Sequence, residues 1–389
     1  MTKARSRLAM VAGAVLLLAA ACSSAATTAP TAAPATAAPT AAPATAAPTA
    51  APTAAPATEA PTAAPTAGGD VKGKKVALIT YGSDPNSQAQ SYYFKTAAEA
   101  DGAAVTIIDG KGDITVQVKA IEDLLAAGDY AGIAFDPADP TAASEISKKV
   151  QDAGVSLLLY ESLPPDTVAP FARFNDCELA KKAGADAATY VKDVMKQTPK
   201  YVIFDLLAFE ICHVLRMGCF VEGIKSVAPD AVQVFWDEVP FDKNLAMAKM
   251  EDQLQANPDF NIYTGCGSDM VLGGIAGLEA GGRGKADNKA PVSEYVVTID
   301  GTLPELQRLV DPSSSVVSTI TMTPKVNGAA FWTMLKDIMT GQTGPTEAKV
   351  VDLPGLIMPE KCSEVASIYQ EQYGPTEMFE PLDCSKAGS

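Results

Sequence analysis

Acidic and amide side chains follow several predicted strands of this sequence. Residues 295–299 are all β-branched or aromatic, which predicts a strand buried on both faces, and Asp300 follows it at once. In open α/β sheets small ligands bind outside the carboxyl ends of the strands, so a carboxylate here is placed to face a ligand. Asp300 could instead form a turn or cap the next helix. The other residues expected at strand ends are Asp84, Asn86, Asp136, Glu161, Phe241, Ser268 and Asp269.

This set of side chains suits a neutral ligand that is rich in hydroxyl groups. Carboxylates accept hydrogen bonds from hydroxyls, arginine donates through a planar fork, and aromatic faces cover the apolar side of a sugar ring. Arg216, in a predicted helix, is the candidate donor. Tyr92 is a further candidate contact, although it and Tyr93 could both belong to a buried helix face and only one can point to a cleft.

Each candidate also has a plainer interpretation. Arg216 could pair with an acidic residue on the surface, and Glu161 could close a salt bridge. Phe241 could be a core residue. The pair Asn175-Asp176 is expected to cap the helix that follows rather than to bind a ligand.

Strands and helices alternate along the chain from residue 72 onwards. Apolar runs predict strands at residues 76–81, 105–109, 133–135 and 155–160, and a second series runs from residue 201 to residue 300. Short turns between them favour βαβ units and parallel sheets. Two series of similar length predict an α/β fold with two Rossmann-like lobes. The predicted boundaries place residues 72–197 and 322–345 in an N-terminal lobe, and residues 198–321 and 346–389 in a C-terminal lobe with a tail.

The N-terminal region carries the pattern of an export signal. Lys3, Arg5 and Arg7 precede an apolar run from residue 8 to residue 21, which is too short to span a bilayer comfortably. Cys22 follows small residues and resembles the lipidated cysteine of the bacterial lipobox, so residues 1–21 are expected to be a lipoprotein signal peptide; an ordinary signal peptide is the alternative. Residues 22–71 continue as an Ala, Pro and Thr-rich linker, a composition that favours an extended spacer.

The charge and the cysteine content of the chain restrict its possible partners and suggest disulfide bonds. The net charge of −16 argues against a nucleic-acid partner, because phosphates require clustered Lys and Arg. Apart from Cys22, six cysteines remain in a chain expected to be exported, so disulfides are plausible. Cys362 and Cys384 form the favoured pair, since they would close a tail with few other anchors. Cys212 and Cys219 lie two turns apart on one predicted helix, too far to bridge, which leaves the partners of Cys177, Cys212, Cys219 and Cys266 open.

Several short motifs, in one order, resemble the type I periplasmic substrate-binding proteins of ABC transporters, in particular the ribose- and galactose-binding group. The resemblance covers nearly all of residues 73–345 and rests on the following segments: Asp300-Gly301-Thr302, similar to the family's hinge-side ligand aspartate; residues 267–273, similar to its Asn-Asp-x-Met-Ala-x-Gly helix start; residues 216–220, similar to its Arg-x-x-Gly-Phe helix; and Phe241-Asp242, similar to its sugar-stacking Phe-Asp.

The sequence departs from the family pattern at several of these positions. Gly267-Ser268 replaces Asn-Asp, Cys219 replaces a glycine, and Glu161-Ser162 stands where Asp-Arg is common, so a bidentate donor is missing from the first lobe. We interpret these departures as a change of ligand, so that ribose itself is not assumed. The resemblance implies three hinge crossings and closure of two lobes around one ligand.

Enzymatic schemes find little support in the sequence. His213 is the only histidine, so a nucleophile, histidine and acid triad would depend on it. No Gly-x-Ser-x-Gly or Cys-x-x-Cys motif occurs, and neither a metal nor a cofactor is expected. An exported hydrolase that uses only carboxylates is the remaining enzymatic alternative.

The resemblance therefore implies a non-enzymatic, extracytoplasmic solute-binding lipoprotein. It would capture a small polar ligand, expected to be a monosaccharide, and deliver it to an ABC permease while Cys22 anchors it to the membrane. A receptor that reports a sugar, nucleoside or autoinducer to a membrane sensor would use the same closed state, and the sequence does not separate these alternatives. The expected ligand-binding residues are Asp84, Asn86, Tyr92, Glu161, Arg216, Phe241, Ser268, Asp269 and Asp300.

Overall fold

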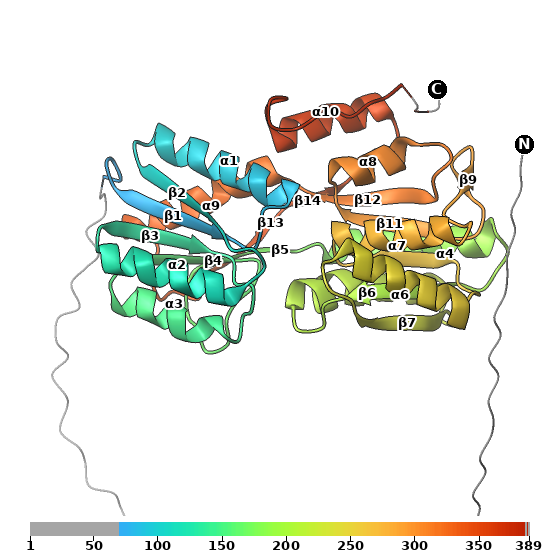
Figure 1. Cartoon of the computed structure of the whole chain (residues 1–389), viewed down its shortest axis with the longest axis horizontal. Helices are drawn as coiled ribbons and strands as arrows, with labels where there is room; N and C mark the ends of the chain where they lie inside the picture. The colour runs from blue at the N-terminus through green and yellow to red at the C-terminus, as the bar shows by residue number, and fades with distance from the viewer. Residues whose placement is uncertain (1–69, 386, 388–389) are drawn as a thin grey trace, which may run out of the picture. The chain divides into compact units, whose positions relative to one another are not determined.

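A computed structural model describes residues 70–385 and residue 387. The expected signal peptide, Cys22 and the linker up to residue 69 lie outside these residues. Within the described part, no helix is long and apolar enough to cross a bilayer. The described chain contains two six-stranded sheets, each of which forms the centre of one lobe (Figure 1).

The sheet of the N-terminal lobe has the strand order β13-β5-β4-β3-β1-β2 and is parallel throughout. Its strands are aliphatic because both faces are covered by helices. In β1, for example, every residue after Lys75 is buried. The strands are β1 (Lys75–Thr80), β2 (Ala104–Asp109), β3 (Tyr130–Phe135), β4 (Ser156–Tyr160), β5 (Phe171–Phe174) and β13 (Val350–Leu353).

Helices α1 (Pro85–Ala100) and α9 (Pro324–Met339) pack against each other on one face of this sheet. Helices α2 (Ile114–Ala127) and α3 (Ala143–Asp152) cover the other face, where Ile121 and Ile146 join the strand residues in a separate apolar cluster. This two-layered covering buries both faces of the sheet and leaves the carboxyl ends of the strands free to form a site.

The sheet of the C-terminal lobe has the order β14-β12-β11-β8-β6-β7. It is parallel except for β14, which runs antiparallel to β12. A short hairpin, β9 (Ala286–Asp287) and β10 (Ala290–Pro291), lies apart from it. The strands of the sheet are β6 (Lys200–Asp205), β7 (Val232–Glu238), β8 (Ile262–Gly265), β11 (Tyr295–Asp300), β12 (Val316–Met322) and β14 (Gly355–Ile357).

The helices of this lobe form two groups. Helix α4 (Cys177–Asp193) packs against α5 (Cys219–Val227), which continues the π-helix η1 (Ile211–Gly218). Helices α6 (Lys243–Ala256) and α7 (Ser268–Ala280) pack together on the other face, followed by α8 (Leu303–Val310). The lobe boundary therefore differs from the expected one: α4 shares an apolar cluster with β6 and β11, and so belongs to the second lobe although it precedes residue 197.

The chain crosses between the two sheets three times within the described residues, after β5, after β12 and after β13. The third crossing explains a second difference from the expected boundary. Strand β13 pairs with β5 in the first lobe, whereas residues beyond 345 were expected in the second. Three separate segments of the chain thus connect the lobes, and together they form the multi-crossing hinge that the family resemblance implied.

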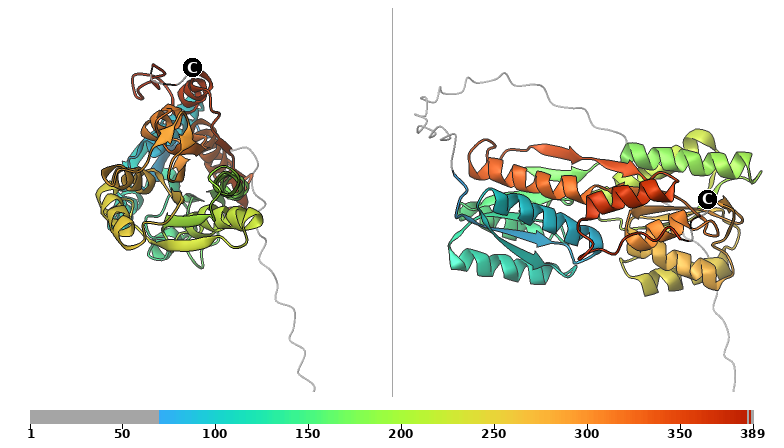
Figure 2. Two further views of the ribbon diagram at one scale, coloured as in Figure 1. Left: turned by 90° about the vertical axis from the view of Figure 1, so that its right-hand side faces the viewer. Right: turned by 90° about the horizontal axis from the view of Figure 1, so that it is seen from above.

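The C-terminal tail forms helix α10 (Cys362–Tyr373), and a disulfide joins Cys362 to Cys384, the pair that the sequence favoured. Helix α10 contacts α1 and α9 of the first lobe and α8 of the second. It lies across the two sets of helices in Figure 1 and in the right-hand view of Figure 2. The tail therefore touches both lobes rather than belonging to the second alone.

Candidate functional site

A cleft of about 650 Å³ is lined by residues of both lobes. In the first lobe the lining comes from the segments after β1, β2, β3 and β4, and in the second from η1 and from the segments after β7, β8 and β11. These are the carboxyl ends of strands, as the sequence predicted. Eight of the nine expected ligand residues line the cleft, namely Asp84, Asn86, Glu161, Arg216, Phe241, Ser268, Asp269 and Asp300.

Tyr92 is the exception. It lies on α1 and lines a separate hollow together with Met378 from the tail. Its ring packs edge-on against Tyr93 at 5.0 Å, and the Tyr93 hydroxyl donates to the carbonyl of Glu371 on α10. The tail, whose fold the sequence did not reveal, thus occupies the surroundings of the residue expected to contact the ligand.

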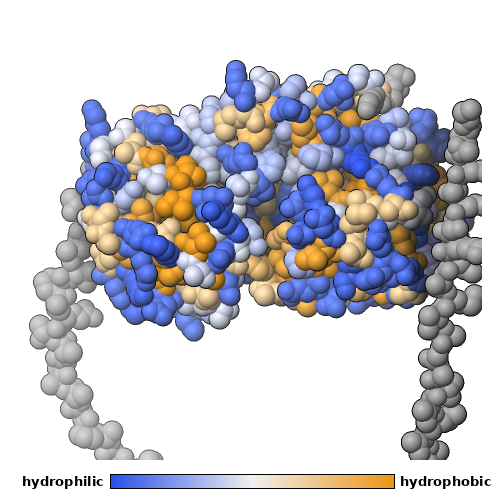
Figure 3. Space-filling view, in the orientation of Figure 1, coloured by the Kyte–Doolittle hydropathy of each residue, from blue (hydrophilic) through white to orange (hydrophobic). Residues whose placement is uncertain are grey.

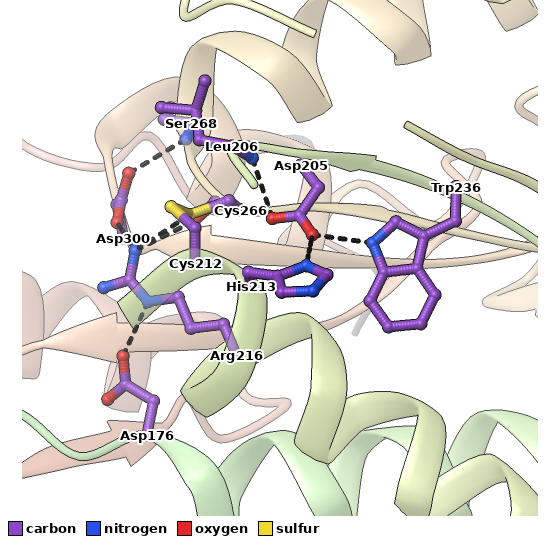
Figure 4. The surroundings of a disulfide bond; sticks show 10 residues. All are labelled: Asp176, Asp205, Leu206, Cys212, His213, Arg216, Trp236, Cys266, Ser268 and Asp300. Atoms are coloured by element: carbon purple, nitrogen blue, oxygen red, sulfur yellow. Dashed lines mark hydrogen bonds and ion pairs between the residues drawn. A yellow bond between two sulfur atoms is a disulfide. The ribbon is translucent and has the colours of Figure 1, made fainter. Parts of the chain in front are cut away.

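Arg216 is the most buried charged group of the cleft wall, and two acids and a carbonyl hold it. Its Nε donates to Asp176 Oδ2 at 2.9 Å and its Nη1 donates to the carbonyl of Cys266 at 2.9 Å (Figure 4). Nη1 also lies 3.5 Å from Asp300 Oδ1. The Nη2 group is buried and has no hydrogen-bond partner in the structure. Since buried donors are normally satisfied, Nη2 is a natural donor for a ligand oxygen.

Two disulfides fix the segment that carries Arg216. Cys212 bonds Cys266, and Cys219 bonds Cys177. Cys212 and Cys219 therefore do not bond each other, in agreement with their separation on one helix, and each has a distant partner. Cys266 is itself an acceptor for Arg216, and Cys177 follows the acceptor Asp176 in sequence. Covalent bonds thus join η1 and α5 to both segments that hold the guanidinium.

Asp300 projects from the end of β11 on an unusual backbone. Its φ angle is 107°, a value that non-glycine residues rarely adopt and that costs on the order of 1 kcal/mol or more. The amide of Ser268 donates to its Oδ2 at 2.9 Å. Burial raises the pKa of Asp300 to about 7, while Arg216 opposes this rise. Near neutral pH this carboxyl group is therefore partly protonated, so it can either donate or accept a hydrogen bond.

Glu161 faces the cleft from the first lobe and also has a positive φ, of 59°. Burial, reinforced by Asp84 and Asp300, raises the pKa of Glu161 to about 8 against the opposing effect of Arg216. Asp136 is nearly fully buried beside it, and burial raises its pKa well above the usual range. Asp84, in contrast, caps α1 by accepting from the amides of Asn86 and Ser87, so part of its hydrogen-bonding capacity is already used.

Two aromatic rings from opposite lobes meet at the cleft. Phe241 of the second lobe lies edge-on to Tyr81 of the first, with ring centroids 6.1 Å apart. Gly267 makes room for Phe241, because a Cβ at this position would lie 2.5 Å from Phe241 Cε1 and 3.2 Å from Asp300 Oδ2. The glycine that replaces the family's asparagine therefore permits this placement of the ring.

The remaining expected residues already have protein partners. The hydroxyl of Ser268 shares a hydrogen bond of 2.8 Å with that of Thr302, and Asp269 lies 3.3 Å from Lys243. His213 Nδ1 shares a hydrogen bond of 2.7 Å with Asp205 Oδ2, and Trp236 Nε1 donates to the same oxygen (Figure 4). His213 does not belong to the cleft lining.

Sequence reasoning missed several lining residues. Tyr81 was placed inside the predicted strand 76–81, but β1 ends at Thr80, so Tyr81 stands at a strand end. Thr302 lies two residues after β11 and could have been found by the rule that selected Asp300. Lys111 lies on the turn after β2, where no motif marks it. Asp176 was expected to cap α4, but its side chain makes no capping hydrogen bond and instead binds Arg216. Its role depends on α4 packing against α5, which the local sequence does not show.

Two parallel-sheet lobes, three crossings and a polar cleft at the strand ends define a two-lobed α/β binding protein. The family model described as periplasmic binding protein domain matches residues 76–343, and the chain belongs to this family. Membership also assigns it to the non-enzymatic binding proteins, which act outside the cytoplasm.

Among known proteins, the chain is similar to the ribose import binding protein RbsB of Bacillus subtilis (strain 168), with 23% identity over 247 residues that cover 63% of this chain and 74% of the relative. It is also 24% identical to the ABC transporter periplasmic-binding protein YphF of Escherichia coli (strain K12), over 51% of this chain and 66% of that protein.

Solved structures share the fold at low sequence identity. A Mycobacterium smegmatis protein in complex with β-D-fucofuranose superposes with a TM-score of 0.63 at 19% identity, covering 79% of this chain and 98% of that one. An ABC transporter solute binding protein from Bacillus halodurans C-125 with bound myo-inositol gives 0.61 at 20% identity, covering 78% and 100%.

Proposed function

We propose that the chain is the sugar- or polyol-binding component of an ABC importer and that it binds its ligand in the cleft between the lobes. One observation carries this proposal: Glu161 of the first lobe and Asp300 of the second, each on a positive-φ backbone, line one cleft together with the buried Arg216. Strained carboxylates in a shared cavity are expected at ligand sites rather than in a structural core.

The relatives support a small hydroxyl-rich ligand. Fucofuranose and myo-inositol are the molecules bound in the two similar structures, and ribose import is the role of the Bacillus relative. The chemistry of the cleft agrees with such ligands, because the acids accept from hydroxyls, Arg216 Nη2 donates, and Phe241 offers an apolar face.

Ligand binding is expected to favour the closed arrangement of the lobes, since Arg216 and Glu161 come from different lobes and one ligand can bridge them. The closed form is then the state that a permease would recognise. The contact between Tyr81 and Phe241 lies at the same interface and supplies an apolar contribution to closure.

A thermal-shift screen of pentoses, hexoses and polyols tests this function. A ligand that binds only the folded state raises the melting temperature in proportion to the logarithm of its concentration. We expect at least one of these compounds to stabilise the parent protein and the Asp300→Asn variant to lose that stabilisation. The proposal fails if no compound shifts the parent, or if variant and parent shift equally.

Lipid anchoring through Cys22 completes the proposed function. It is supported by the charged and apolar segments that precede this cysteine and by the linker that follows it. The full chain, expressed in a bacterium, is expected to sediment with membranes, and the Cys22→Ala variant is expected to appear in the soluble fraction. Mass spectrometry of the mature N-terminus provides the direct measurement. An unmodified Cys22 would contradict the anchor without affecting the proposal for the cleft.

A further inference from the structure

The acids of the cleft wall differ in what neutralises them. Asp269 pairs with Lys243, and Asp300 shares Arg216 with Asp176. Asp84 accepts from backbone amides at the start of α1. These three carboxylates therefore have protein partners before any ligand binds, and all of the paired cations belong to the second lobe.

Glu161 and Asp136 lack a cationic partner in their own lobe, although a backbone hydrogen bond at Tyr81 partly offsets the effect of burial on the pKa of Asp136. Neither forms an ion pair among the described residues, and the charges that act on Asp136 are the carboxylates of Glu161 and Asp84. Arg216 attracts Glu161 only from the opposite lobe. Lys111 lines the same wall but is exposed and pairs with no carboxylate of the described chain. The position after Glu161 holds Ser162, which supplies no positive charge.

A second observation points to a ligand at this wall. Asn86 also lines the cleft, is only 5% exposed, and its amide oxygen is buried without a hydrogen-bond partner. Its amide nitrogen is directed to Met322 Sδ at 2.7 Å, which orients the oxygen as the free acceptor. An unsatisfied buried acceptor costs about 1–3 kcal/mol, so a donor from a ligand would relieve it. The first-lobe wall thus offers a free acceptor and two carboxyl groups whose ionisation burial opposes, but few cationic donors.

A neutral hydroxyl supplies one donor and no positive charge, so it cannot favour the ionised form of these carboxyl groups. An ammonium group supplies three donors and a full charge, and charge-assisted hydrogen bonds are roughly twice as strong as neutral ones. It would also supply the positive charge that no ion pair of the first-lobe wall gives to Glu161 and Asp136. Buried carboxylates are stable in their charged form only when they are paired in this way.

We propose that Glu161, Asp136 and the Asn86 amide oxygen form an ammonium subsite, and that the ligand is an amino sugar or a related amino polyol. This inference rests on the proposed function, since Arg216, Asp300 and Phe241 would hold the hydroxyl-bearing remainder of the same molecule. The amine lies against the first lobe and the ring against the second, so that one ligand bridges them.

Matched pairs of sugars test the subsite in the full chain. Thermal shift and titration calorimetry compare D-glucosamine with D-glucose and with N-acetyl-D-glucosamine. The same measurements compare D-galactosamine with D-galactose and with N-acetyl-D-galactosamine. We expect an amino sugar to bind roughly tenfold or more tightly than its neutral counterpart, because a charge-assisted contact replaces a neutral one. Acetylation, which removes the charge, is expected to abolish the preference. Calcium and magnesium chloride, tested alone, measure whether a metal cation gives the same stabilisation.

The Glu161→Gln variant separates charge from shape. It keeps the size of the side chain but removes the carboxylate, so we expect it to weaken binding of the amino sugar about tenfold more than binding of the neutral sugar. Asp136→Asn provides a second, independent variant. Asp152→Asn, an exposed change of equal charge on α3, serves as the control. Neutral sugars that bind as tightly as amino sugars, or stabilisation by a metal ion in place of the amine, would overturn the subsite while leaving the proposed function intact. No stabilisation by any compound would contradict both.

Discussion

Arg216 and Asp176 form an ion pair in which the side chains are only 4% and 2% exposed. The pair joins η1 to the start of α4, so it links two helices that pack on the same face of the second sheet. An isolated buried charge is costly, and this guanidinium depends on its acids to remain charged inside the lobe. The same group presents an unpaired Nη2, which makes the pair part of both the fold and the site.

Asp176→Asn should therefore destabilise the protein strongly. Removing one partner of a buried pair typically costs about 3–5 kcal/mol, and we expect the lower end of that range because Asp300 still faces Arg216. Urea unfolding of the ligand-free protein measures the loss. Lys148→Met breaks the exposed pair with Asp152 and should cost no more than about 0.5 kcal/mol. Equal effects of the two changes would show that the buried pair is dispensable.

The acidic groups of the cleft should make stability depend on pH. The pKa of Glu161 is raised to about 8 and that of Asp300 to about 7 in the folded chain, so between roughly pH 4 and pH 8 the folded state binds more protons than the unfolded state. Stability should then decrease as pH rises through this window. The free energy of unfolding of Glu161→Gln should be higher than that of the parent at pH 8, by on the order of 2 kcal/mol, and equal to it near pH 4.

Unfolding midpoints in urea, measured at both pH values without ligand, test this dependence. The Asp152→Asn variant, whose carboxylate is exposed, should follow the parent. A parent protein that becomes more stable from pH 4 to pH 8 would contradict the raised pKa values of Glu161 and Asp300.

The disulfide between Cys212 and Cys266 should matter for binding as well as for stability. The double variant with serine at both positions is expected to lose about 2–4 kcal/mol of stability and, because the carbonyl of Cys266 holds Arg216, about tenfold in ligand affinity. The corresponding serine variant of Cys362 and Cys384 should lose stability by a similar mechanism with little loss of affinity. Calorimetric titration on both variants distinguishes the two effects, and equal losses of affinity would remove the link to Arg216.

Gly267→Ala should impair the site by moving Phe241. The new Cβ would lie 2.5 Å from the ring, too close for the present arrangement, while the backbone of Gly267 is extended and would not itself be strained. We expect about a tenfold loss of affinity for a ligand that stacks on Phe241, with a small change in melting temperature. Gly344→Ala, where the nearest atom would be 3.6 Å away, is the control. Unchanged affinity would argue that Phe241 does not contact the ligand.

Local sequence pattern predicted much of the framework. The strand that ends at Asp300 is β11, and the strands of both expected series lie in the two sheets. These predictions rest on alternation of aliphatic runs with turns, which depends on neighbouring residues alone. Strands β5 and β13 and helix α10 were not predicted, because their short or mixed patterns become regular only through long-range pairing and packing.

The composition of the site was easier to predict than its connections. The strand-end rule found Glu161 and Asp300 because it needs only the place of a residue after a strand. The partners of Arg216 and of Cys212 and Cys219 were beyond its reach, since they depend on which helices pack together. The hollow that Tyr92 lines was not foreseen for the same reason: it is shared with the tail residue Met378, which is nearly 290 positions away in sequence.

The surface around the lobes is mixed in polarity, with hydrophilic residues over both of them in the view of Figure 3. Against this background the C-terminal helix has a practical use. The hydroxyl of Tyr373 donates to the carbonyl of Asp300 at 2.9 Å, and α10 also contacts helices of both lobes. A dye attached at the exposed Ser367 would lie on a helix that is hydrogen-bonded to the backbone of Asp300, so its emission is expected to change when the proposed ligand binds. Labelling the tail in this way would turn the protein into an optical sensor of its own ligand.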